Sequence, residues 1–135
     1  MNVTQHKSRL ERLDSKWQYQ RAMLLKCAEL LTKDSTDKLW VKTQKDLEER
    51  LQNPDIIVRQ KAMDWKKRAP NKLSLIQFIL NTFGENPPEG PKRHKLQSMF
   101  EGYPFACIIP ENVRKEIYQQ AYYPHLQKPG LSMEP

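Results

Sequence analysis

The first third of the chain carries a long, uninterrupted helical repeat. The stretch Thr4–Thr32 contains no Pro and no Gly, and mainly apolar side chains recur along it in steps of three and four residues. The repeat comprises Leu10, Leu13, Trp17, Gln20, Leu24, Cys27 and Leu31. Such steps place side chains on one face of an α-helix, as in the seam of packed helices. The repeat predicts a single helix of about 43 Å. Because this is longer than a small domain needs, we expect the helix to belong to a bundle or to pack on a partner.

Capping residues and apolar spacing indicate two further helices after this one. A polar break at Lys33–Asp37 separates the first helix from a second, which Ser35 or Thr36 can cap. The pair Asn53–Pro54 ends the second helix and starts a third, with Asn as N-cap and Pro at the first helical position. The third helix is expected to run to about Ala69.

A fourth helix is expected at Lys72–Phe83. Asn71 can cap its start, and Gly84 can end it. Its apolar side chains surround nearly the whole circumference, a pattern typical of a helix buried in the middle of a core. We therefore expect this helix to be the central element of the domain.

The C-terminal third is expected to be looser and is rich in Pro and Tyr. A stiff Pro-rich loop leads to a short helix over Pro91–Phe100, followed by an extended segment at 102–109 and a last helix over Pro110–Tyr122. The fold class predicted is all-α: an irregular helical bundle of about four main helices with a long N-terminal helix. Residues 1–123 are expected to form one helical domain and residues 124–135 a C-terminal tail.

Composition limits the class of protein. No apolar run approaches the roughly 18 residues of a membrane span, and the N-terminal residues do not resemble a secretory signal. We therefore expect a soluble, cytoplasmic protein. Leu, Ile, Val and Phe supply about 22% of the residues, just above the roughly 20% below which a charged chain stays disordered. A core is possible, but it will be lean.

The chain is basic, and the excess charge is unevenly distributed. Its 23 Lys and Arg residues against 16 Asp and Glu residues give a formal net charge of +7. Residues 1–33 carry a net charge of +4 and residues 54–70 one of +3. Cations near a phosphate backbone release condensed counterions, which supplies affinity that does not depend on base sequence. The clustering therefore predicts contact with the backbone of DNA or RNA.

Three groups of cations are the candidate nucleic-acid-binding residues. One flanks the seam of the first helix, one ends the third helix, and one follows the Pro-rich loop. The candidates are Arg9, Arg12, Lys16, Lys66, Lys67, Arg68, Lys92, Arg93 and Lys95. Trp65 and Tyr103 lie close to these groups in the chain and could stack on unpaired bases. In the plainer interpretation, Trp65 belongs to the core and the cations that end the third helix complement its dipole.

One spacing imitates a metal-dependent nuclease. Pro54–Asp55 followed by Asp64–Trp65–Lys66 matches the pattern PD…(D/E)xK. Both carboxylates fall within one expected helix, about 13.5 Å apart along its axis, which is too far to share a cation. The two cysteines cannot form a four-thiolate zinc site, and the three histidines form no i, i+4 pair of metal ligands. We expect no catalytic residues, no metal and no cofactor.

Two functional hypotheses remain, and neither is enzymatic. In the first, the protein binds nucleic-acid backbone as a small subunit of a larger nucleoprotein assembly. In size, helicity and basicity it resembles the small helical subunits of ribonucleoprotein machines such as CRISPR effector small subunits. A helix-turn-helix reader using Arg59 and Gln60 is disfavoured because Ile56–Val58 would place apolar bulk at the bases. In the second hypothesis, the chain is a protein-interaction or adaptor module, or a homo-oligomer. It would dock through the N-terminal heptad helix or through the C-terminal tyrosines, which are Tyr103, Tyr118, Tyr122 and Tyr123.

Overall fold

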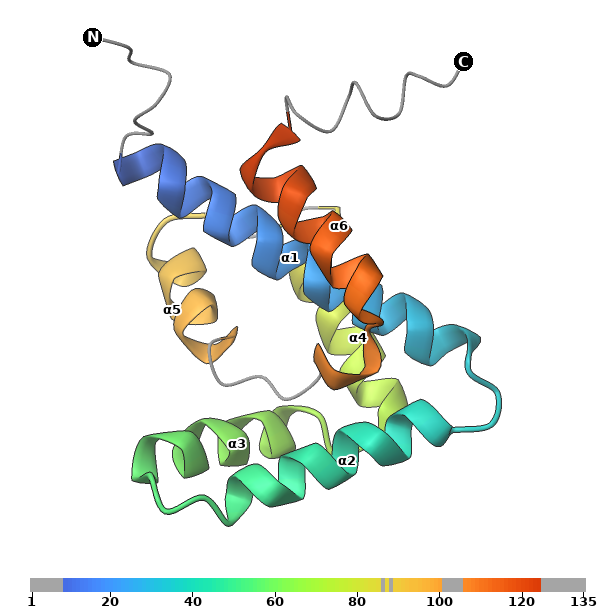
Figure 1. The fold of residues 1–135 in the computed structure, drawn as a ribbon. Helices are drawn as coiled ribbons and strands as arrows, with labels where there is room; N and C mark the ends of the chain where they lie inside the picture. The colour runs from blue at the N-terminus through green and yellow to red at the C-terminus, as the bar shows by residue number, and fades with distance from the viewer. Residues whose placement is uncertain (1–8, 86, 88, 101–105, 125–135) are drawn as a thin grey trace, which may run out of the picture.

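All regular structure in the described part of the chain is helical (Figure 1). The computed structural model describes residues 9–85, 87, 89–100 and 106–124, with side chains from residue 14 onward except that of residue 99. The elements are α1 (Arg9–Lys33), α2 (Lys38–Leu51), α3 (Ile56–Arg68), α4 (Lys72–Phe83), α5 (Pro91–Phe100), the 3-10 helix η2 (Ala106–Ile108) and α6 (Glu111–Tyr122). The expected all-α fold is confirmed, with six α-helices in these residues rather than about four.

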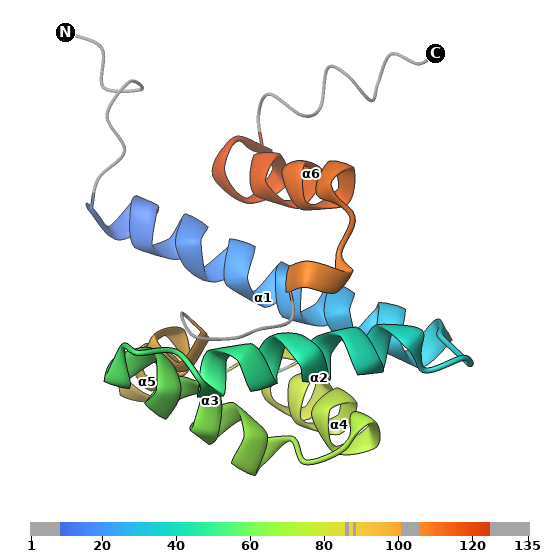
Figure 2. The ribbon, with the colours of Figure 1, turned by 60° about the horizontal axis from the view of Figure 1, so that its bottom comes forward.

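The long helix α1 is the centre of the bundle. It packs against α6 and against α4, and Figure 2 shows α6 above α1 and α4 below it. Helices α2 and α3 form a hairpin beside this stack, and η2 sits against both α1 and α2. Residues 1–8, which include the expected helix start at Thr4, and residues 125–135 of the expected tail lie outside the described residues.

The seam predicted along α1 lies inside the protein's own core. Trp17, Leu24, Cys27 and Leu31 are all buried, and Gln20 is buried with them. They meet apolar residues from every other element, because the core cluster extends from α1 to α6. The described part of the heptad face is therefore used within the chain and is not a free docking surface.

Helix α4 is not central, so that expectation was wrong. Leu75, Ile79 and Phe83 face the core, but the side chains of Leu73 and Leu80 are 62% and 50% exposed. A chain with so few large apolar residues cannot surround a second helix on all sides. The longer helix α1 takes the central place because its 25 residues can contact neighbours on two opposite sides.

The helix ends follow the sequence rules in some places and depart from them in others. The side chain of Asn71 accepts a hydrogen bond from the Ser74 amide, and Gly84 ends α4, as predicted. The third helix starts later than expected, at Ile56. Its N-cap is Asp55, whose carboxylate accepts a hydrogen bond from the Ile57 amide at 2.9 Å. Asn53 stabilises the turn just before this N-cap, because its side-chain oxygen accepts a hydrogen bond from the Asp55 amide at 2.8 Å.

The C-terminal third is more regular than expected. Residues 106–108 of the expected extended segment form a 3-10 helix, while its residues 102–105, Tyr103 among them, lie outside the described residues. Ile108 and Ile109 are buried, so this turn fixes the chain to the core before α6 begins. The last helix is present within one residue of its expected start.

Candidate interaction surfaces

The predicted cations on the first helix are poorly placed to form a surface of their own. Arg9 and Arg12 lie in the first turns of α1, where side chains are outside the described residues. Lys16 is half-buried and already has an interaction partner. None of these three positions therefore provides a described cation that is available to a ligand.

The cluster that ends α3 is partly neutralised. The ammonium of Lys66 lies 3.4 Å from a carboxylate oxygen of Glu48 on α2. The guanidinium of Arg68 lies 3.3 Å from Asp64 one turn earlier, with its centre 5.9 Å from that of the Phe78 ring. Lys67 is exposed, and no carboxylate of the described residues pairs with it.

In the cluster on α5, one cation has a carboxylate partner and the others are exposed. Arg93 lies over the Trp17 ring, with its guanidinium carbon 4.8 Å from the ring centre, and it forms a 3.2 Å ion pair with Asp14. It thus fastens α5 to α1. Lys92 and Lys95 are exposed, and within the described residues neither has a carboxylate partner.

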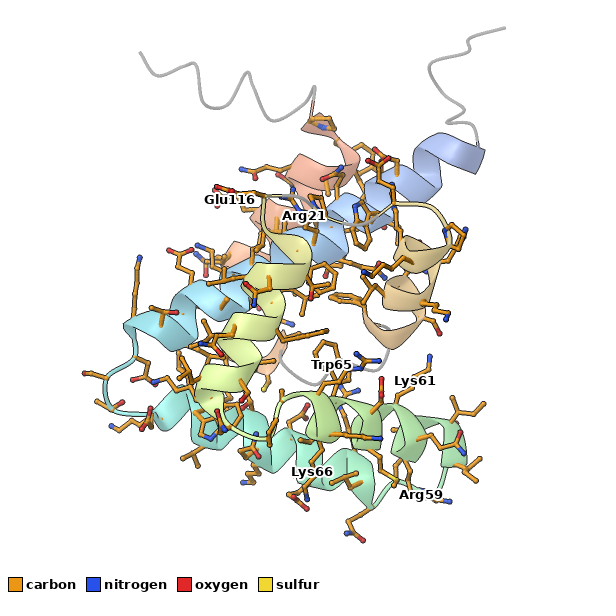
Figure 3. The ribbon with its side chains drawn as sticks, turned by 180° about the vertical axis from the view of Figure 1, so that it is seen from behind. Arg21, Arg59, Lys61, Trp65, Lys66 and Glu116 are labelled. Atoms are coloured by element: carbon orange, nitrogen blue, oxygen red, sulfur yellow. The ribbon has the colours of Figure 1, made fainter. Side chains whose placement is uncertain are left out.

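Helix α5, which carries one cation group, packs against α3, which carries another. A shallow groove of about 260 Å³ runs between α3 and α5, where Lys95 faces Lys61 and Asp64. Figure 3 shows Lys61 projecting from α3 on one side and Lys66 on the other. Lys61 and Lys66 therefore project to different sides of α3, and Lys66 and Arg68 each have a carboxylate partner.

A cluster of tyrosines between α6 and α1 forms a second surface. The ring of Tyr118 lies 4.6 Å from that of Tyr122, 6.3 Å from that of Tyr123 and 5.8 Å from that of Tyr19, measured between ring centres. Tyr118 and Tyr123 are 45% and 43% exposed, whereas Tyr19 and Tyr122 are half-buried. We call these four residues the tyrosine cluster. Burial, followed by the neighbouring hydroxyls of Tyr118 and Tyr19, raises the pKa of Tyr122.

An open groove of about 360 Å³ adjoins the tyrosine cluster. Its lining residues are Tyr19, Glu111, Arg114, Lys115, Tyr118 and Gln119. It therefore combines aromatic walls with two cations and one carboxylate, and Lys115 lies 3.7 Å from Glu111. The sequence identified the tyrosines of α6 but not Tyr19, since nothing local to residue 19 shows that α6 packs there.

The residues of the nuclease-like spacing have structural roles. Asp55 caps α3, and Asp64 pairs with Arg68 in the same helix. In the described residues no group of three or more His, Cys, Asp or Glu side chains could hold a metal ion. Nor does any helix there combine the length and apolarity that a bilayer span requires.

Cys27 and Cys107, which are 80 residues apart in the chain, meet where η2 packs on α1. Both are free thiols; Cys27 is buried and Cys107 half-buried. Burial, followed by the proximity of Cys107, raises the pKa of Cys27, and burial also raises that of Cys107. Raised thiol pKa values oppose formation of the nucleophilic thiolate.

Comparison with known proteins adds no relative to this description. No family model matches the chain, and the comparisons with curated proteins and with solved structures gave no match.

Proposed function

We propose that this protein is a non-enzymatic interaction module that docks a protein partner through the tyrosine cluster, as a subunit of a larger cytoplasmic assembly. The observation that carries the proposal is the exposure of Tyr118 and Tyr123, at 45% and 43%, in a cluster beside an open groove. Of the two routes to a protein partner that the sequence suggested, the heptad seam is occupied by the core. Of the C-terminal tyrosines, Tyr118 and Tyr123 are exposed, Tyr122 is half-buried, and Tyr103 lies outside the described residues.

The packing of the cluster favours binding. Each exposed ring is held against others, with Tyr118 in contact with three tyrosines at ring-centre distances of 4.6 to 6.3 Å. Side chains that are already ordered lose little conformational entropy when a partner covers them. Tyrosine also offers a large apolar face together with a hydroxyl, which is why it is enriched at interfaces.

The residues around the groove indicate what kind of partner segment would fit the surface. Arg114 and Lys115 stand on α6 beside the rings, and both are exposed. A partner segment with an aromatic or apolar residue for the groove and a carboxylate for Arg114 would match both its shape and its charge. Charges at the edge of such an interface select the partner and its orientation more than they add affinity.

Site-specific photocrosslinking tests the proposal. A photoreactive phenylalanine analogue is placed at Tyr118 in one variant and at exposed Gln120 on the same helix in a matched control. We expect a discrete crosslinked protein in native cell extract from position 118 and none, or much less, from position 120. The purified partner should lose at least about tenfold in affinity on Tyr118→Ser. Equal crosslinking at both positions, or unchanged affinity of the Ser variant, would contradict the proposal.

A nucleic-acid role is the second candidate, and it is supported by Lys67, Lys92 and Lys95, which are exposed and have no carboxylate partner among the described residues. If these cations contact phosphates, affinity for generic single- and double-stranded DNA and RNA should fall steeply as salt rises. The double variant Lys92→Gln/Lys95→Gln should reduce the salt dependence. A Lys38→Gln/Lys45→Gln variant changes the charge equally on α2 and serves as the control. Absence of binding at low salt, or equal effects of the two variants, would remove this candidate.

A further inference from the structure

The outer face of α4 carries an apolar stripe that the fold leaves uncovered. Leu73, Ile76 and Leu80 follow one another at steps of three and four, so they lie on one side of the helix. Leu73 and Leu80 are 62% and 50% exposed, and Ile76 is half-buried. Figure 3 views the molecule from the side of α4, where this helix crosses α1. We call these three residues the α4 stripe.

The helix that carries the α4 stripe has little charge of its own, in a chain with 29% charged residues. Lys72 is the one ionisable residue among the twelve of α4. Its ammonium is directed to the α1–α2 turn, where it lies 2.6 Å from the Asp37 carboxylate and 2.8 Å from the Asp34 carbonyl. The stripe therefore presents neither sign of charge to whatever covers it.

The polar residues of this face can pair with copies of themselves. Gln77 lies four residues after Leu73 and three before Leu80, so it is on the same side of α4. Its side chain is exposed, as is that of Asn81. A side-chain amide has both donors and an acceptor, so two identical amides related by a two-fold axis complement each other. A face of apolar residues and amides, without charge, is self-complementary.

We propose that the α4 stripe is covered by a second copy of this chain in an antiparallel, two-fold arrangement. With the axis beside Ile76 and Gln77, each Leu73 meets Leu80 of the second copy, because both lie equally far from the centre of the stripe. The net charge of +7 makes copies repel elsewhere, so an uncharged face is where two of them can approach. Helix α4 is only about 18 Å long, and one helix per subunit buries less area than a stable dimer requires. The dimer is weak and reversible.

The proposal is independent of the tyrosine cluster. Helices α4 and α6 pack on opposite sides of α1, as Figure 2 shows. A dimer formed through α4 therefore leaves both tyrosine clusters accessible, and a Tyr118→Ser variant should dimerise as the native chain does. Failure of one proposal does not imply failure of the other.

Sedimentation equilibrium over protein concentrations up to about 1 mM tests the dimer, since weak complexes form in that range. The native chain should show a reversible monomer–dimer equilibrium. Leu80→Glu should weaken it by at least about tenfold because it places two carboxylates in the interface. Val41→Glu is the matched control, because Val41 is 63% exposed on α2 and lies outside the stripe. A native chain that stays monomeric, or equal effects of the two variants, would overturn the proposal.

Mixed disulfides test the antiparallel arrangement. In a Cys107→Ser background, a chain with Leu73→Cys is mixed with one carrying Leu80→Cys and oxidised with oxidised glutathione. Antiparallel stripes bring the two new thiols together, so crosslinked heterodimer should exceed both crosslinked homodimers severalfold. A statistical mixture, or an excess of homodimer, would overturn the two-fold arrangement. Unchanged circular dichroism spectra of all variants exclude misfolding as the cause.

Discussion

Gln20 places an amide in the apolar seam of α1. The side chain is 3% exposed, and its carbonyl oxygen Oε1 has no hydrogen-bond partner among the described residues. Burying an unpaired polar atom costs free energy, since water no longer satisfies it. The seam is therefore less stable at this residue than its packing alone would allow.

Replacing Gln20 with an apolar residue of similar shape should stabilise the fold. Gln20→Met keeps the length of the side chain and removes the unpaired atom, so we expect the free energy of unfolding to rise by about 1 kcal/mol. Urea denaturation followed by circular dichroism measures it as a higher midpoint at an unchanged slope. Leu24→Met, one turn further along the seam, changes shape without removing a polar atom and should not stabilise. A midpoint lowered by Gln20→Met would show that the amide is satisfied in solution.

The buried thiol of Cys27 should be chemically silent in the folded protein. Burial raises its pKa, and the reactive thiolate is correspondingly scarce. We expect a thiol-specific reagent at pH 8 to modify Cys27 only at the rate of unfolding, and Cys107 sooner because it is half-buried. Mass spectrometry of peptides after timed labelling distinguishes the two sites. Rapid native labelling of Cys27 would mean that η2 does not cover it.

At the scale of elements, a side chain from a distant segment can cap a helix whose own residues leave its last carbonyl groups without hydrogen-bond partners. Arg21 of α1 donates hydrogen bonds from Nε to the Phe83 carbonyl at 2.6 Å and from a terminal nitrogen to the Gly84 carbonyl at 2.5 Å. A cation at the C-terminal end of α4 satisfies carbonyls that have no partner within the helix and opposes its dipole. This contact joins the two helices as well as capping one of them.

Removing the Arg21 guanidinium should cost more than removing an exposed one. Arg21→Ala is expected to lower the free energy of unfolding by about 1.5 kcal/mol, because two charge-assisted hydrogen bonds are lost. Arg114→Ala on α6, where the side chain is exposed, is the control and should change stability little. Chemical denaturation of both variants gives the comparison. Equal midpoints would show that the α4 carbonyls are hydrated equally well without Arg21.

The turn between α1 and α2 should show a pH dependence of stability. Asp34 accepts hydrogen bonds from the Thr36 hydroxyl at 2.6 Å and from the Leu39 amide at 2.7 Å. The Thr36 side chain, and next the Leu39 amide, lower the pKa of Asp34 from its ordinary 3.8. A carboxyl with a lowered pKa in the folded state stabilises it above the ordinary value and stops doing so as the pH falls through the lowered one.

Asp34→Ala should therefore lower the thermal midpoint at pH 7, and the difference from the native chain should shrink as the pH falls below 3.8. Calorimetric scans of both proteins at several pH values provide the measurement. Asp14→Ala is a useful control, because its carboxylate is exposed and pairs only with Arg93 among the contacts described. A difference that stays constant down to the acid limit would show that packing, not the carboxylate, holds the turn.

At the scale of the whole molecule, salt separates the two kinds of association. Two copies that each carry +7 repel one another at a distance, while the α4 stripe itself is uncharged. Raising the salt from about 0.05 to 0.5 M screens the repulsion, so dimerisation should become tighter. Binding to nucleic acid should become weaker over the same range. Sedimentation at the two salt concentrations measures the first effect, and a dimer that dissociates as salt rises would contradict an uncharged interface.

Local features of the sequence predicted much of the fold. The spacing from Trp17 to Leu31 predicts a buried seam, and Asn71 and Gly84 mark both ends of α4 correctly. Such signals depend on residues a few positions apart, so they can be recognised without knowing the rest of the structure. They could not show contacts from distant segments, such as the hydrogen bond from Arg21 to the Phe83 carbonyl at the end of α4, 62 residues away in the chain.

The sequence by itself determined that this chain is helical, basic and short of large apolar residues, because period, charge and composition are properties of the residues alone. Only the tertiary structure decided which apolar face stays exposed and which cations stay free. Leu80 is exposed because α1, and not α4, occupies the centre of the bundle. Arg93 pairs with the carboxylate of Asp14, 79 residues away in the chain. The physical reason is that burial and charge pairing depend on which distant segments meet, and neither is encoded within one helix.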